Sequence, residues 1–108
     1  MTWKITYYNA DLEEEILEFP EGLLARYLRL TDLMQIQGAR LGEPHTKAMS
    51  DGLFELRLKR KEGIARVFYC TIVDKKIHML YSFIKKTEKT PSDELEKAQK
   101  YRNIYLKG

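Results

Sequence analysis

The sequence has few of the residues that cross-link or interrupt small proteins. Its 108 residues include one cysteine, Cys70, together with three prolines and six glycines. A single cysteine cannot form an internal disulfide, which excludes a disulfide-stabilised secreted scaffold and is typical of a reducing compartment. No apolar stretch approaches the roughly 20 residues that cross a bilayer. We therefore expect a soluble, cytoplasmic protein with no membrane partner.

Residues that bind metals or phosphate loops are equally scarce. The only histidines are His45 and His78, and there is no Cys/His cluster or glycine-rich phosphate loop. We therefore expect no metal and no other cofactor. The two histidines leave open an acid–base pair acting on RNA. His78 follows a turn, and we expect it to be solvated.

The composition is sufficient for one hydrophobic core. With 44% hydrophobic residues in 108, the chain has the size of a single domain covering residues 1–108. Charge is uneven: residues 1–30 carry six acids and three bases, whereas residues 53–90 carry ten bases and four acids. The basic half is therefore the place to look for an anionic partner.

Hydrophobic periodicity predicts the element order β-α-α-β-β-β-α. The expected elements are a strand over 3–8, a short helix opened by a capping box at Asp11, a helix from about Pro20 to Gln37 stopped by Gly38, strands over 54–59, 64–73 and 76–85, and a helix from Thr90 to about 106. Residues 39–52 lack periodicity and are interpreted as a loop. This order describes an α+β domain, an antiparallel sheet with an N-terminal helical hairpin and a C-terminal helix, and we expect the helices on one face of the sheet.

The strand over 54–59 is amphipathic in an informative way. Glu55, Arg57 and Lys59 alternate with apolar residues and so share one face, where cations can follow a phosphodiester backbone. Arg66, on the next strand, would join them. A buried arginine needs a partner, and either a structural ion pair with Glu55 or a ligand phosphate would satisfy it.

Further cations and aromatic rings follow in the same half of the chain. Lys85, Lys86 and Lys89 extend the positive surface, although such a run is also typical of a solvated edge. Tyr69, Tyr81 and Phe83 offer rings on which a base could stack, or they belong to the core. Composition and spacing alone do not choose between these alternatives.

Four segments together resemble the RelE/HigB superfamily of bacterial toxins, and within it the phage-derived Gp49-like branch. They are LGEPHTK (41–47), DGLFELRLK (51–59), GIARVFY (63–69) and FIKKTEKTP (83–91). The resemblance implies a RelE-like, microbial-ribonuclease-like fold. It also implies a toxin, an mRNA interferase that cleaves translated mRNA on the ribosome and thereby inhibits translation. The implied partner is a helix-turn-helix antitoxin, with DNA contacted only indirectly through the antitoxin complex.

The resemblance also implies residue roles in a metal-independent attack by the substrate's 2′-hydroxyl. Arg66 would stabilise the phosphate in the transition state, Lys59 or Arg57 would transfer or support a proton, and Lys85 or Lys86 would contact a phosphate. Additional RNA contacts are expected from four basic side chains that flank these residues in the sequence, namely Lys47, Arg60, Lys61 and Lys89.

One family feature has no clear counterpart here. Some members place a catalytic tyrosine near the C-terminus, whereas Tyr101 and Tyr105 fall on a predicted helix, where packing is expected. The general acid is therefore unassigned. The alternative function is a non-catalytic antitoxin-binding or regulatory module of the same fold.

Overall fold

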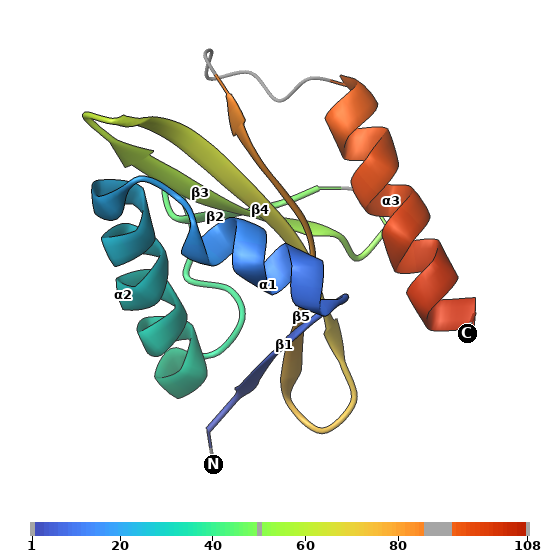
Figure 1. Ribbon diagram of the computed structural model, residues 1–108. Helices are drawn as coiled ribbons and strands as arrows, with labels where there is room; N and C mark the ends of the chain where they lie inside the picture. The colour runs from blue at the N-terminus through green and yellow to red at the C-terminus, as the bar shows by residue number, and fades with distance from the viewer. Residues whose placement is uncertain (1, 50, 86–91, 108) are drawn as a thin grey trace.

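The computed structural model describes residues 2–49, 51–85 and 92–107 (Figure 1). Its elements are β1 (Lys4–Tyr7), α1 (Ala10–Leu17), α2 (Glu21–Gln37), β2 (Thr46–Ala48), β3 (Phe54–Arg60), β4 (Gly63–Ile72), β5 (Lys76–Lys85) and α3 (Ser92–Lys107). The α+β class and the predicted element order are confirmed, with β2 added inside the predicted loop. At three residues, β2 is too short to produce a periodic pattern.

Within the described residues the sheet has the strand order β1-β5-β4-β3-β2. Strands β3 to β5 pair in antiparallel fashion, as predicted, and β2 also pairs antiparallel with β3. β1 instead pairs parallel with β5, with Lys4 opposite Lys76, so the sheet is mixed. Periodicity identifies a strand but not its partner, and the partner of β1 lies about 70 residues away in the sequence.

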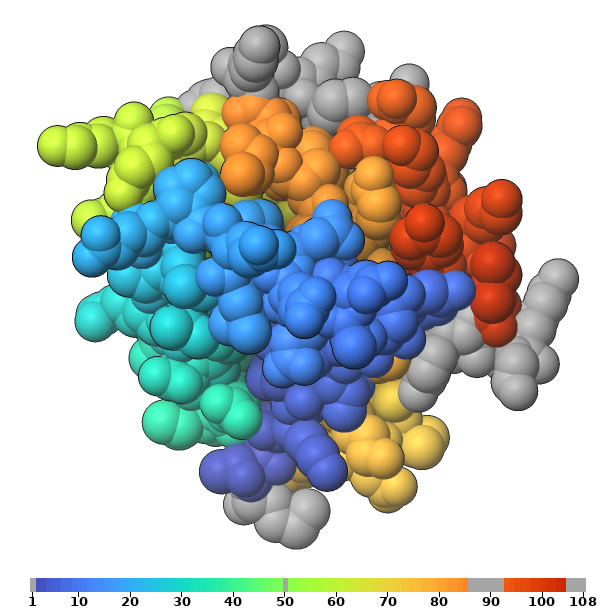
Figure 2. Space-filling view, in the orientation of Figure 1, coloured from blue at the N-terminus to red at the C-terminus, as the bar shows by residue number. Residues whose placement is uncertain are grey.

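Helices α1 and α2 cover one face of this sheet (Figure 1). Leu56 and Leu58 of β3 and Val67 of β4 are fully buried against α2 residues such as Leu23 and Met34. In Figure 2, α1 and α2 form the front of the molecule, and the β3–β4 hairpin extends beyond them at the upper left. This face therefore forms the larger apolar core.

Helix α3 packs on the opposite face of the sheet. Ala98 of α3 is buried in a second apolar cluster with Phe68, Cys70 and Leu80. The prediction that the helices share one face is therefore wrong. β4 and β5 carry apolar residues on both of their faces, and a second covering element is needed to bury them.

The structure differs from the predicted start of α1 and confirms the predicted end of α2. The N-cap of α1 is Asn9, whose Oδ1 accepts a hydrogen bond of 2.8 Å from the N–H of Leu12. Asp11 lies inside the first turn, so the predicted capping box at Asp11 is wrong. Gly38 ends α2 as predicted, with φ at 110°, a value that disfavours a side chain.

The start of α2 is held by the β3–β4 hairpin. Glu62, in the hairpin turn, accepts a 2.7 Å hydrogen bond from the N–H of Gly22, one of the first groups of the helix without an intrahelical partner. A carboxylate at a helix N-terminus is electrostatically favourable. Among the described residues, no helix is long and apolar enough to cross a membrane.

Candidate functional site

The antiparallel register gathers several of the predicted cations on the sheet face opposite α1 and α2. Arg57 of β3 lies directly opposite Arg66 of β4, and Arg66 lies opposite Phe83 of β5. Two positions further along each strand, Lys59 and Lys85 flank Ile64 in the same way. Directly opposed residues point to the same face of a sheet. We call Arg57, Lys59, Arg66 and Lys85 the cation cluster.

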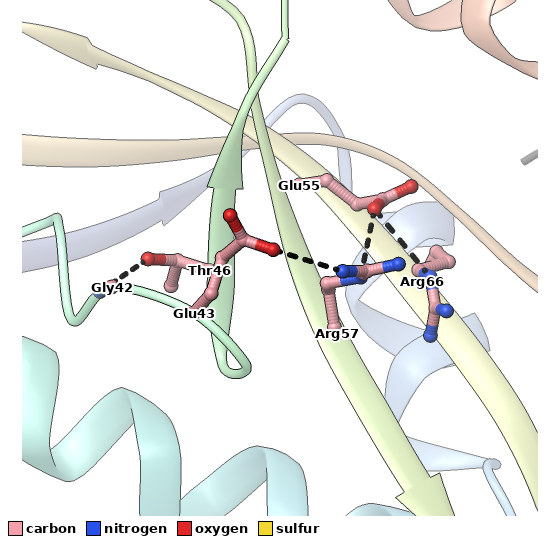
Figure 3. Close-up of polar contacts among 6 residues, drawn as sticks. All are labelled: Gly42, Glu43, Thr46, Glu55, Arg57 and Arg66. Atoms are coloured by element: carbon pink, nitrogen blue, oxygen red, sulfur yellow. Dashed lines mark hydrogen bonds and ion pairs between the residues drawn. The ribbon is translucent and has the colours of Figure 1, made fainter.

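A buried carboxylate lies beside this cluster (Figure 3). The side chain of Glu55 is 1% exposed, and its Oε1 lies 3.3 Å from Arg57 Nε and 3.5 Å from Arg66 Nε. The ion pair between Glu55 and Arg66 that the sequence left open is therefore present. Because Arg57 shares the same oxygen, the arrangement is a carboxylate between two guanidiniums.

The same arginines line a small pocket. Pro44, Arg57, Lys59 and Arg66 enclose a volume of about 240 Å³. This is below the roughly 300–1,000 Å³ of ordinary small-molecule pockets. Three cationic side chains around so small a space suit one phosphate group of a polymer better than a complete metabolite.

The loop before β2 forms one wall of this pocket. Thr46 Oγ1 accepts a 2.9 Å hydrogen bond from the Gly42 N–H (Figure 3), and the N–H of Arg57 donates to the carbonyl of His45 at 2.8 Å. Glu43, whose side chain is 68% exposed, lies 3.7 Å from Arg57 Nη1. The loop therefore brings a solvated carboxylate to the edge of the cation cluster.

Sequence reasoning missed Glu43 and Pro44 as members of the site. Both lie in a segment without periodicity, so no pattern related them to β3. Their only signal was their place in the segment LGEPHTK, which contributed to the family resemblance. Glu55 is one of the two alternative partners that the sequence offers Arg66, whereas its contact with Arg57 is not predicted.

The remaining predicted RNA contacts lie around the cluster rather than within it. Lys47 is exposed on β2, opposite Glu55. Arg60 ends β3 on the row of Leu56 and Leu58, so alternation directs it to the other face, and it is exposed. Lys61 is exposed in the hairpin turn. Two further predicted residues, Lys86 and Lys89, lie outside the described residues.

The two histidines do not form a pair. His45 immediately precedes β2, whereas His78 lies on β5, with β3 and β4 between those strands. Three strand spacings amount to about 14 Å, too far for acid and base to act on one phosphate. His78 is also 3% exposed, with its Nδ1 2.8 Å from Thr6 Oγ1, so the prediction that it is solvated is wrong. β1 packs beside β5 here, and burial lowers the pKa of His78.

Two of the candidate stacking rings, Tyr69 and Phe83, differ in burial. Tyr69 is fully buried and donates its hydroxyl proton to the Ala39 carbonyl at 2.5 Å; burial raises its pKa to about 12. Phe83 is only partly buried, lies opposite Arg66 in the sheet and stacks on Phe68 with ring centroids 5.9 Å apart. Phe83 is therefore the candidate ring closest in register to the cation cluster.

The other rings belong to a separate aromatic group. Tyr101 stacks on Tyr8 at 4.9 Å and contacts Tyr81 edge-on at 5.6 Å. The Tyr81 hydroxyl donates to Glu94 at 3.2 Å, and its pKa is raised, mainly by burial and also by that carboxylate. Tyr101 is thus a packing residue, as predicted. The side chain of Tyr105 lies outside the described residues.

The side chains of the cation cluster suit the binding of an anion. Across residues 2–49, 51–85 and 92–107, no group of three or more His, Cys, Asp or Glu side chains is placed to hold a metal ion. The guanidinium and ammonium groups of the cluster instead match phosphate oxygens, which accept charge-assisted hydrogen bonds.

Comparisons with known proteins bear on the family and the fold of the chain. Residues 14–103 match the family model described as phage-derived protein Gp49-like. The fold is similar to an arginine double mutant of E. coli toxin RelE in the free state, with a TM-score of 0.64, 13% identity, and 93% of this chain and 97% of that chain covered. It is also similar to the archaeal RelE–RelB complex from Pyrococcus horikoshii OT3, with a TM-score of 0.55, 19% identity, and coverage of 83% and 100%. No curated protein sequence matches the chain.

Proposed function

Because the chain belongs to the phage-derived Gp49-like family and has the RelE fold, we propose that it is the toxin of a toxin–antitoxin pair. We propose further that it is an endoribonuclease that cleaves translated mRNA on the ribosome. The observation that carries this proposal is the pocket lined by Arg57, Lys59 and Arg66, whose size and charge suit a phosphodiester group.

The reaction uses the nucleophile already present in RNA. The 2′-oxygen forms a bond to phosphorus and loses its proton, the bond from phosphorus to the 5′-oxygen breaks, and that oxygen receives a proton. The products are a 2′,3′-cyclic phosphate and a free 5′-hydroxyl. The protein has to stabilise negative charge on the phosphate and transfer protons.

The residues of the cation cluster divide these tasks. Arg66, 4% exposed and directly opposite Arg57, contributes a fixed guanidinium for the charge that develops in the transition state. Lys59 is exposed at the mouth of the pocket and supports proton transfer at the reacting oxygens. Lys85, across Ile64 from Lys59, contacts the scissile or a neighbouring phosphate.

The proposed partners follow from the same function. The second similar structure is a complex of RelE with RelB. We propose that a cognate helix-turn-helix antitoxin inhibits this chain and that any contact with operator DNA passes through that antitoxin. An antitoxin that places acidic or apolar residues over the cation cluster would neutralise it.

The test is brief expression of the full chain in bacteria with mapping of new RNA 5′ ends. One transcript is translated, and a matched transcript has its start codon destroyed. We expect cuts only in the translated transcript, and we expect Arg66→Ala to lower cleavage by about 10²–10³-fold, typical for loss of one transition-state donor. Cuts in both transcripts would contradict the requirement for the ribosome.

Arg29→Ala is the matched control for Arg66→Ala. It removes the same charge from an exposed position on α2, the helix that packs on the other face of the sheet. We expect this variant to cleave within a few-fold of the parent. Growth arrest without any cuts would contradict the nuclease proposal and favour the alternative, a non-catalytic binding module, for which Arg66 paired with Glu55 would be purely structural.

A further inference from the structure

We propose that Glu55 is a positioning residue that holds the guanidiniums of Arg57 and Arg66 in the orientation required by a phosphate. This inference rests on the proposed function, because the phosphate is that of the RNA substrate. Glu55 itself does not line the pocket formed by Pro44, Arg57, Lys59 and Arg66. Its effect on the reaction therefore has to pass through the two arginines.

The contact geometry supports this role. Glu55 Oε1 meets each arginine at Nε, the nitrogen nearest the aliphatic stem. In Figure 3 the terminal nitrogens of Arg66 point away from Glu55. Arg66 Nη1 also donates to the Ala65 carbonyl at 3.1 Å, a second fixed contact on the same guanidinium. A guanidinium that forms an ion pair beside its Nε can still offer its terminal N–H groups to a phosphate.

Electrostatics explains why a carboxylate is needed at this position. Arg57 and Arg66 are directly opposed across β3 and β4, and like charges in such a pair repel each other. Glu55 lies on the same strand as Arg57, two residues earlier, and therefore on the same face. Its charge offsets the repulsion where little water is available for screening, since Glu55 and Arg66 are both nearly fully buried.

The position of Glu55 predicts an unusual kinetic pattern for its isosteric variant. Glu55→Gln removes a negative charge near an anion site, which on its own strengthens binding of RNA. It also releases two guanidiniums from their common partner, which lowers the fraction of molecules in the productive geometry. We expect kcat for cleavage of ribosome-bound mRNA to fall by at least 10-fold, with KM unchanged or lower.

Two variants control this measurement. Glu96→Gln makes the same chemical change at an exposed position on α3, and we expect it to leave kcat and KM unchanged. Glu55→Asp keeps the charge on a shorter side chain, and we expect it to recover part of the lost kcat. Glu55→Gln with the parent's kcat would overturn the proposal. A fall in kcat accompanied by a higher KM would also overturn it, because that pattern indicates general damage to the site.

A measurement without cleavage separates this inference from the proposed function. The full chain is labelled with ¹⁵N, and the arginine Nε–H signals are followed by NMR during titration with inorganic phosphate. We expect the signals of Arg57 and Arg66 to shift in the parent. In Glu55→Gln we expect the limiting shift of both signals at saturating phosphate to fall at least threefold, because the released guanidiniums no longer hold one orientation around the anion. Equal shifts in parent and variant would overturn the positioning role. If the parent cleaves no RNA but shows this difference, only the proposed function fails.

Discussion

Adjacent residues of β3 lie in opposite surroundings. Leu56 and Leu58 are fully buried against α1 and α2, whereas Arg57 and Lys59 line a pocket on the other side of the same strand. The period of two in a strand separates the two sets. One seven-residue strand thus supplies both the centre of a core and half of a candidate site. The stability of the core and the chemistry of the candidate site can therefore be altered independently by changing neighbouring residues of β3.

The second face of the sheet is itself divided along β4. Phe68 and Cys70 are buried under α3 near Ala98, while Arg66, two residues before Phe68, belongs to the cation cluster. α3 therefore covers one part of this face and leaves the pocket beside it open. The extent of α3 over this face, as much as the strands themselves, therefore determines where the cation cluster lies.

The largest expected effect is on stability and comes from the face of β3 that packs in the core. Leu58→Ala removes a fully buried side chain, and we expect the free energy of unfolding to fall by about 2–5 kcal/mol. Urea denaturation measures this change. Cleavage per folded molecule should equal that of the parent, because Leu58 faces away from the pocket. A folded variant with parental stability would contradict the division of the strand into two faces.

The neighbouring substitution is expected to show the opposite pattern. Lys59→Ala removes an exposed side chain, so stability should change by less than about 0.5 kcal/mol. The rate of mRNA cleavage should fall by about 10²-fold, the lower end for loss of a proton-transfer group. Single-turnover cleavage on ribosomes and urea denaturation on the same sample test both statements. A large loss of stability with unchanged cleavage would reverse the assignment of the two faces.

A smaller effect is expected from the buried histidine. Because the pKa of His78 is lowered in the folded state, the unfolded chain binds a proton more readily below about pH 6.5. The free energy of unfolding should therefore fall as the pH is lowered through this range, by at most about 1.4 kcal/mol per pH unit from this group. His78→Gln should remove that part of the slope, measured by denaturation between pH 7.5 and 5. The same substitution at His45 is the control.

The smallest expected effect concerns the exposed carboxylate beside Arg57. Glu43→Gln removes a charge that competes with a phosphate for Arg57 Nη1, and exposed ion pairs contribute at most about 1 kcal/mol. We expect binding of inorganic phosphate to tighten by a few-fold. The arginine Nε–H titration described above measures it. Weaker phosphate binding in this variant would mean that Glu43 supports the pocket rather than competing with its ligand.

How far the sequence predicts this molecule depends on the range of the interactions. Alternation in β3 correctly assigned the face of Leu56 and Leu58, and Gly38 correctly marked the end of α2, because both are local signals. The parallel pairing of β1 and the position of α3 depend on contacts between distant segments, which no local pattern encodes.

The same distinction applies to the candidate site. The cations of β3 and β4 were predicted from spacing and resemblance, and the register places them together. Glu43 and Pro44 come from a loop whose path depends on the Gly42–Thr46 hydrogen bond and on β2 pairing with β3. His78 was assigned to solvent because its neighbour β1 is supplied from the other end of the chain.

The pairing of β1 with β5 also sets an order of assembly. Strands β3, β4 and β5 follow one another through short turns, so the cation cluster is built from contacts that are local in the sequence. β1 is made first but pairs with a strand that is made about 70 residues later, which requires closure of a long loop. We expect the hairpins to form early in folding and the docking of β1 to come late. The first strand to be synthesised is then among the last to join the sheet.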